Sequence, residues 1–135
     1  MRRLLVLVAL LGLAAACGGS SHARTTALPK LRVAITAQSH HPQLHHTWTY
    51  QVRVTGPSGK PVACRIHLQF FFAGSPVGEV GVHVVDNGFW KETIPATGKD
   101  AFPPASVGQP LVLHATVTAK GYRTGTAGWK VSVVK

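Results

Sequence analysis

The sequence predicts an all-β fold, an antiparallel sandwich of about seven short strands in two sheets. Three observations lead to this prediction. From Leu31 onward apolar and polar residues alternate with a period of two, turn-forming glycines and prolines recur between the alternating runs, and no run has the periodicity of an amphipathic helix. A two-sheet sandwich buries one face of every such strand, and a small barrel is the alternative that uses the same pattern. The length of 135 residues allows one domain.

The chain begins with a predicted signal peptide, residues 1–16. Arg2 and Arg3 precede an apolar stretch that is shorter than the roughly 20 residues needed to span a bilayer as a helix. The run from Leu13 to Cys17 resembles the bacterial lipobox, in which small residues precede a cysteine that is acylated, as with palmitate, and becomes the mature N-terminus. Alanine replaces the large aliphatic residue usual three positions before the cysteine. Ordinary cleavage that leaves a free Cys17 is the alternative.

Residues 17–30 are predicted to form a flexible tether between a lipidated Cys17 and the folded domain. The segment is small and polar, and about 12 such residues reach roughly 20 Å as a coil. Acyl chains supply membrane affinity at about 0.8 kcal/mol per buried CH₂. If Cys17 carries lipid, Cys64 has no disulfide partner. Its place on the apolar face of an expected strand predicts a small buried hydrophobic side chain.

The predicted domain, residues 31–135, begins with four alternating segments. The expected strands are Leu31–Thr36, Trp48–Val54, Val62–Phe72 and Val80–Val84. Glycine and proline between Thr55 and Pro61 predict a turn. The valines at alternate positions of the fourth segment are predicted to form its apolar face. On the same pattern His67, His83 and His114 are predicted to point away from the apolar faces.

Three further segments complete the predicted domain. They are Phe89–Ile94, Leu111–Val117 and Trp129–Val133. The tripeptide Asp86–Gly88 stands between two strand-like segments and predicts a β-hairpin. The proline-bearing stretch 96–110 predicts a loop, and the glycines between 121 and 128 predict a turn before the last strand. Glu92 is predicted to be a buried or edge carboxylate paired with a basic neighbour, which is a structural role.

One run resembles the G-x-P-V-x-G-x-x-V-x-F stretch of bacterial immunoglobulin-like modules. The matching residues are Gly59, Lys60, Pro61, Val62, Ala63, Ile66, Leu68 and Phe70. Cys64 stands where those modules often carry glycine, and the stretch Gly88–Pro95 resembles small actinobacterial lipoproteins of this build. The resemblance spans residues 31–135 and implies an immunoglobulin-like β-sandwich in an exported protein. Such modules act as spacers, adhesins or accessory domains, so the resemblance implies no reaction.

A histidine-rich run between the first two expected strands is the one unusual cluster. Four of the eight histidines, His40, His41, His45 and His46, lie on either side of Pro42. Imidazole is the commonest protein ligand for zinc and copper, and a bend at the proline would bring the two pairs together. The run therefore suggests a copper or zinc site. The alternative is a set of exposed polar loop residues, because no cysteine or carboxylate stands at zinc-site spacing.

Charge and motifs disfavour several classes of function. Lysine and arginine number 14 against four acids, which gives a formal charge of +10. These bases are scattered without a run of three, which argues against a nucleic-acid groove. The few acids, with no nucleophile-elbow, phosphate-loop or zinc-protease motif, argue against an enzyme. A basic domain beside a bilayer attracts anionic lipid or acidic wall polymers.

Together these features predict a non-enzymatic, immunoglobulin-like binding or structural module, lipid-anchored to the extracytoplasmic face of a bacterial cell membrane. Its expected partners are the membrane, through the lipid on Cys17, then anionic lipid or cell-wall polymers, and an unidentified protein. The alternative function is an extracytoplasmic copper- or zinc-binding protein that uses the loop His40–His46. No other cofactor is expected.

Overall fold

The computed structural model describes residues 26–135 and has the predicted fold class, an all-β sandwich of the immunoglobulin-like type. The signal peptide, Cys17 and most of the predicted tether lie outside the described residues. The strands are β1 (Arg32–Ala37), β2 (Trp48–Thr55), β3 (Cys64–Phe72), β4 (Ser75–Val85), β5 (Phe89–Ile94), β6 (Leu111–Thr118) and β7 (Gly125–Val131). A short 3₁₀ helix, Pro104–Ser106, lies between β5 and β6. Within residues 26–135 no helix has the length and apolar character that crossing a membrane requires.

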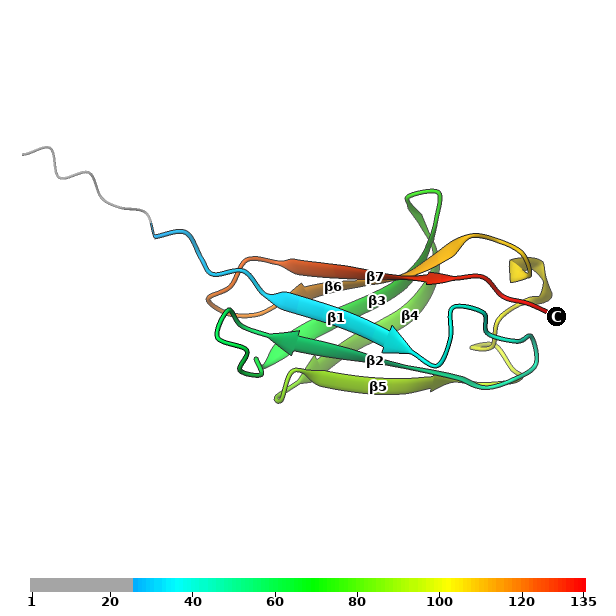
Figure 1. The fold of residues 1–135 in the computed structure, drawn as a ribbon, viewed down its shortest axis with the longest axis horizontal. Coiled ribbons are helices and arrows are strands. Elements are labelled where there is room, and N and C mark those ends of the chain that lie inside the picture. Colours follow the sequence, from blue (N-terminus) through cyan, green and yellow to red (C-terminus); the bar gives the residue numbers. More distant parts are fainter. Residues whose placement is uncertain (1–25) are drawn as a thin grey trace, which may run out of the picture.

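The seven strands divide between two sheets that face each other, rather than closing into a barrel (Figure 1). One sheet has the order β1-β2-β5 and the other the order β4-β3-β6-β7, and all paired strands are antiparallel. The described chain enters at one end of the sandwich, near the start of β1. The C-terminus lies at the opposite end, beside the loop 95–110 that joins β5 to β6 (Figure 1).

The inward side chains of β2, β3 and β6 form the core, as their alternation predicts. They are Trp48, Tyr50, Val52, Val54, Cys64, Ile66, Leu68, Leu111, Leu113, Ala115 and Val117, each at most 9% exposed. Full burial of one large aliphatic side chain is worth about 1.5 to 3 kcal/mol, so this layer holds the sheets together. Cys64 is free and buried, as predicted. Burial raises the pKa of its thiol, which keeps it protonated and unreactive.

Strand β4 departs from the predicted phase because it contains a β-bulge. The pairing of β3 with β4 shifts after Leu68, which lies opposite Gly81, so β4 carries an extra residue there. Beyond the bulge His83 points inward with 18% of its side chain exposed, whereas Val82 and Val84 are 41% and 79% exposed. The predictions of an outward His83 and an apolar valine face are therefore wrong. One extra residue inverts a period-two pattern.

The turn at Asp86–Gly88 does not close the predicted hairpin. β4 pairs with β3 and β5 pairs with β2, so this turn carries the chain from one sheet to the other. The carbonyl of Gly88 accepts a hydrogen bond of 2.7 Å from the backbone N–H of Val54 on β2. The tripeptide specifies a tight turn of the backbone. Which strands then pair depends on the arrangement that buries the apolar face of each strand.

The turn predicted between Gly121 and Gly128 is confirmed only at its beginning. Gly121 lies in a turn that the N–H of Tyr122 closes by donating to the carbonyl of Ala119 at 3.2 Å, whereas Gly125 and Gly128 belong to β7, so the prediction is wrong for them. A Cβ atom added at Gly125 would lie 2.8 Å from Cγ2 of Val33 and 2.9 Å from Cβ of Leu31. Glycine is needed here because the backbone of β7 passes close to β1 and the segment that leads into it. A glycine within a strand often marks such a close approach.

Candidate functional site

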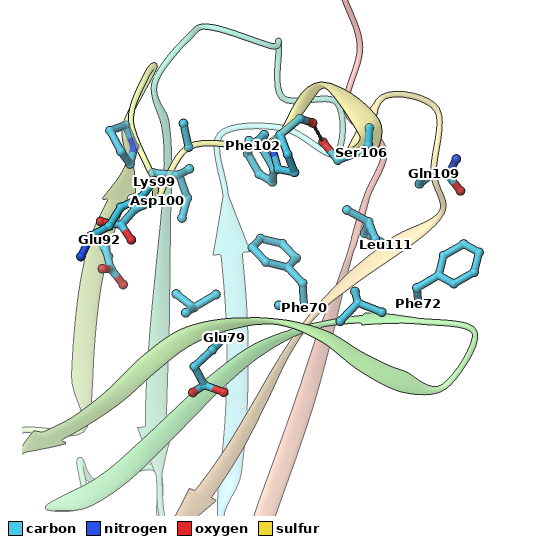
Figure 2. A pocket seen from close by; sticks show the side chains of 18 of the residues that line it. Phe70, Phe72, Glu79, Glu92, Lys99, Asp100, Phe102, Ser106, Gln109 and Leu111 are labelled. Atoms are coloured by element: carbon cyan, nitrogen blue, oxygen red, sulfur yellow. Dashed lines mark hydrogen bonds between the residues drawn. The ribbon is translucent and has the colours of Figure 1, made fainter.

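A groove of about 830 Å³ opens between the sheets at the end of the sandwich away from the chain's entry. It lies between the ends of β3 and β5, the starts of β4 and β6, and the loop 95–110 (Figure 2). Small-molecule sites typically have volumes of about 300 to 1,000 Å³ and predominantly apolar walls. The groove has the size of such a site.

Phe102 anchors the loop that forms one wall of this groove. Its side chain is 9% exposed and meets Trp48 edge-on at 5.8 Å between ring centroids, and Phe70 at 5.5 Å. The following 3₁₀ turn is closed by the Ser106 hydroxyl, which donates a hydrogen bond of 2.6 Å to the carbonyl of Pro103. Stretch 96–110 is a loop as predicted, but its role as a groove wall was not anticipated. The sequence signal for this role is Phe102, a large aromatic residue within a proline-rich loop.

Glu92 lies where the groove meets a cluster of polar and aromatic side chains. Its Oε2 atom accepts hydrogen bonds from the Tyr50 hydroxyl and from Nε1 of Trp90, the latter at 3.2 Å. Nε2 of His83 lies 3.6 Å from the same oxygen, and the His83 ring stacks on Trp90 at 3.7 Å. Two neutral donors therefore hold Glu92, and the base nearest to it is His83, whose Nε2 atom makes no hydrogen bond.

The Tyr50 hydroxyl acts as a hydrogen-bond donor in this cluster. Burial, followed by its hydrogen bond to Glu92, raises the pKa of the hydroxyl well above its usual range. The side chain is only 1% exposed. Tyr50 therefore stays protonated around neutral pH and holds the Glu92 carboxylate in a fixed position.

Two more charged residues, Lys99 and Asp100, line the groove beside Glu92 (Figure 2). Within the described part of the chain, none of the ion pairs found involves either of them. Glu79 also borders the groove, but its carboxylate accepts hydrogen bonds from His67 at 2.6 Å and Gln69 at 3.1 Å. Figure 2 shows that carboxylate on the far side of β4 from Phe102.

The four predicted metal ligands, His40, His41, His45 and His46, lie on an exposed loop. Nδ1 of His40 donates a hydrogen bond of 2.7 Å to the carbonyl of Lys130, and its ring stacks on Trp129 at 4.0 Å. Nδ1 of His46 donates to the carbonyl of Leu44 at 3.1 Å. Across residues 26–135, the structure contains no group of three His, Cys, Asp or Glu side chains placed to share a metal ion.

Comparison with known proteins gives likenesses of fold. No protein-family model matches the chain, and no curated protein matches it. The CARDB domain of a Pyrococcus furiosus protein, in a crystal structure with di-metal ions, matches with a TM-score of 0.48 and 18% identity, over 79% of this chain and 90% of that one. Spo0M, a sporulation control protein of Bacillus subtilis, matches with a TM-score of 0.48 and 10% identity, over 78% of this chain and 50% of that one.

Proposed function

We propose that the chain is a non-enzymatic binding module whose ligand occupies the groove between the sheets. The groove itself is the observation that carries this proposal. Its apolar wall includes Phe70, Phe102 and Leu111, and the charged side chains of Lys99 and Asp100 lie towards the same end as Glu92. A mostly apolar cavity with a few polar groups that orient the ligand is the usual form of a small-molecule site.

The chemistry of the groove supports binding rather than catalysis. A site that works through a covalent intermediate needs a nucleophilic side chain within hydrogen-bond reach of a base. The Ser106 hydroxyl, which borders the groove, donates to a backbone carbonyl. The Tyr50 hydroxyl is buried and protonated, and the Cys64 thiol is buried with a raised pKa. None of these three side chains is poised to attack a substrate.

A lipid on Cys17 is the second part of the proposal, because Leu13 to Cys17 resembles a lipobox. The described chain enters the sandwich at the end opposite the groove, so a tether from the membrane would leave the groove accessible (Figure 1). Every lysine and arginine from Lys30 onward is exposed, and such a surface suits anionic lipid or wall polymers. The unidentified protein partner stays a prediction.

We expect Cys17→Ser to move the protein from the membrane fraction to the aqueous fraction, because it removes the acylated thiol. Cell fractionation followed by immunoblotting measures this distribution. Cys64→Ala is the matched control and should leave the protein in the membrane fraction, because that thiol is buried in the core. An intact mass that shows unmodified Cys17 in the membrane fraction would overturn the anchoring proposal.

We expect the groove to bind the neutral fluorescent probe N-phenyl-1-naphthylamine saturably, with an affinity that Ala105→Trp lowers at least about tenfold. Ala105 borders the groove, so an indole at this position fills the space that the probe needs. Val84→Trp adds an indole at a position that is 79% exposed and away from the groove, and should leave the affinity unchanged. A titration followed by fluorescence measures both. Equal affinities in the two variants would contradict binding in the groove.

Copper or zinc binding by the histidine loop is the second candidate function. The hydrogen bonds made by the rings of His40 and His46 favour it. Because Nδ1 of His40 and of His46 donate to backbone carbonyls, Nε2 of each neutral ring is left with its lone pair. A metal-binding histidine usually has this arrangement. Native mass spectrometry with copper or zinc tests the candidate. Loss of a stoichiometric ion on changing His40, His41, His45 and His46 to alanine would support it, and weak or absent binding by the unchanged protein would reject it.

A further inference from the structure

The acids of this basic protein are unevenly placed. Only four acids accompany 14 lysines and arginines. Two of them, Glu92 and Asp100, line the groove, and Figure 2 shows both towards the same end of it. Asp86 lies in the turn at the opposite end of the sandwich, and the carboxylate of Glu79 is bound by His67 and Gln69. The groove is therefore the place where carboxylates are available to a ligand.

The Glu92 carboxylate is held in place for such contact. Both of its neutral donors, Tyr50 and Trp90, bind the Oε2 atom. Among the described residues no hydrogen bond to Oε1 is present, so this oxygen remains able to accept one. A carboxylate that is already oriented loses little conformational entropy when it binds a ligand.

The charges at this end of the groove favour a cation. Lys99 is the one base that lines the groove, so its single positive charge accompanies the two negative charges of Glu92 and Asp100. No ion pair within the described residues neutralises Asp100. Lys99 is exposed and its side chain is flexible, so its ammonium group can turn towards solvent when a ligand cation approaches.

Away from the charged end the groove is mostly apolar, with Ser106 and Gln109 at its border. Figure 2 shows Phe70 and Phe102 in the middle of the groove, with Leu111 and Phe72 beyond them. Burial of apolar ligand surface against such walls favours binding. A ligand that uses both regions has a polar head at one end and an apolar body.

We propose that the ligand of the groove is a small amphiphile with a cationic, amine-type head. The head contacts the carboxylates of Glu92 and Asp100, and the apolar body lies along Phe102 and Phe70 towards Phe72. This inference rests on the proposed function, because it names the class of ligand that the same groove binds. A hydrogen bond from an ammonium group to a carboxylate is stronger than one between neutral groups, which makes the head the source of selectivity.

The test compares three probes with the same alkyl chain: n-octylammonium, 1-octanol and octanoate. The purified protein is titrated with each, and amide NMR shifts give both the affinity and the location of binding. We expect n-octylammonium to bind most tightly, with shifts at Ile94, Phe102 and Leu111 at the groove. Glu92→Gln and Asp100→Asn should each weaken it about five- to tenfold, and Lys99→Gln should strengthen it.

Asp86→Asn is the matched control, because it removes the same charge at the opposite end of the sandwich and should leave the affinity unchanged. An equal loss in Asp86→Asn and Glu92→Gln would overturn the inference, since it would indicate a general effect of net charge. Equal binding of 1-octanol and n-octylammonium, or tightest binding of octanoate, would also overturn it while leaving the groove as a binding site. Absence of binding by all three probes at the groove would overturn the proposed function as well.

Discussion

Replacement of Gly88 by alanine is expected to lower the free energy of unfolding by more than about 3 kcal/mol. Gly88 has a φ of +64°, a conformation that costs other residues about 1 to 3 kcal/mol. A Cβ at this position would also lie 2.3 Å from the carbonyl oxygen of Val54 and 2.9 Å from that of Val62. Both are backbone atoms, so the clash cannot be relieved by turning a side chain. Urea unfolding followed by tryptophan fluorescence measures the change.

Gly59→Ala separates the clash from the backbone strain. Gly59 has a φ of +81°, but a Cβ there would meet no atom within 4 Å. Its substitution should therefore cost only the strain of the positive φ, about 1 to 2 kcal/mol. If the two variants lose the same free energy of unfolding, the expected clash between a Cβ at position 88 and the carbonyls of Val54 and Val62 does not occur.

Phe102→Ala is expected to lower the free energy of unfolding by about 3 to 5 kcal/mol, as is usual when a buried aromatic side chain is removed. The side chain is 9% exposed and packs on Trp48 and Phe70. Its loss leaves a cavity beneath the loop 95–110 and removes the main apolar anchor of that loop. Chemical unfolding gives the change in stability, and amide hydrogen exchange should show the largest increase in this loop.

Phe72→Ala is the matched control within the same groove. Phe72 lies at the end of β3 with 39% of its surface exposed, so its truncation should cost less than about 1 kcal/mol. Equal losses of stability would show that Phe102 does not anchor the loop.

Much of the fold is predictable because alternation is a local property. Trp48 to Val54 on β2 and Cys64 to Leu68 on β3 bury the side chains that a period of two selects. The same rule fails at His83, because a bulge near Gly81 shifts the phase by one residue. The bulge belongs to the pairing of β4 with β3. Gly81 is the kind of residue that marks a bulge within a strand, but a glycine by itself does not specify which neighbouring residue is extra.

The candidate site is much less predictable. Phe70 lies on β3, whereas Glu92, Asp100 and Phe102 lie on β5 and the loop that follows it, and the packing of the two sheets brings these two parts of the chain together. The histidine run shows the opposite case, because its residues are close in sequence. His40 nevertheless stacks on Trp129, while His46 bonds within its own loop. Residues that are close along the chain therefore have different surroundings in the folded domain.

The sequence by itself determined the fold class, the number of strands and the inward face of most of them, since burial of alternating apolar side chains depends on near neighbours along the chain. The tertiary structure decided three further features: the crossing at Asp86–Gly88, the close passage of β7 at Gly125, and the groove between the ends of the two sheets. Each of these depends on contacts between segments far apart in sequence. Such contacts form only when both sheets are in place, so no local pattern encodes them.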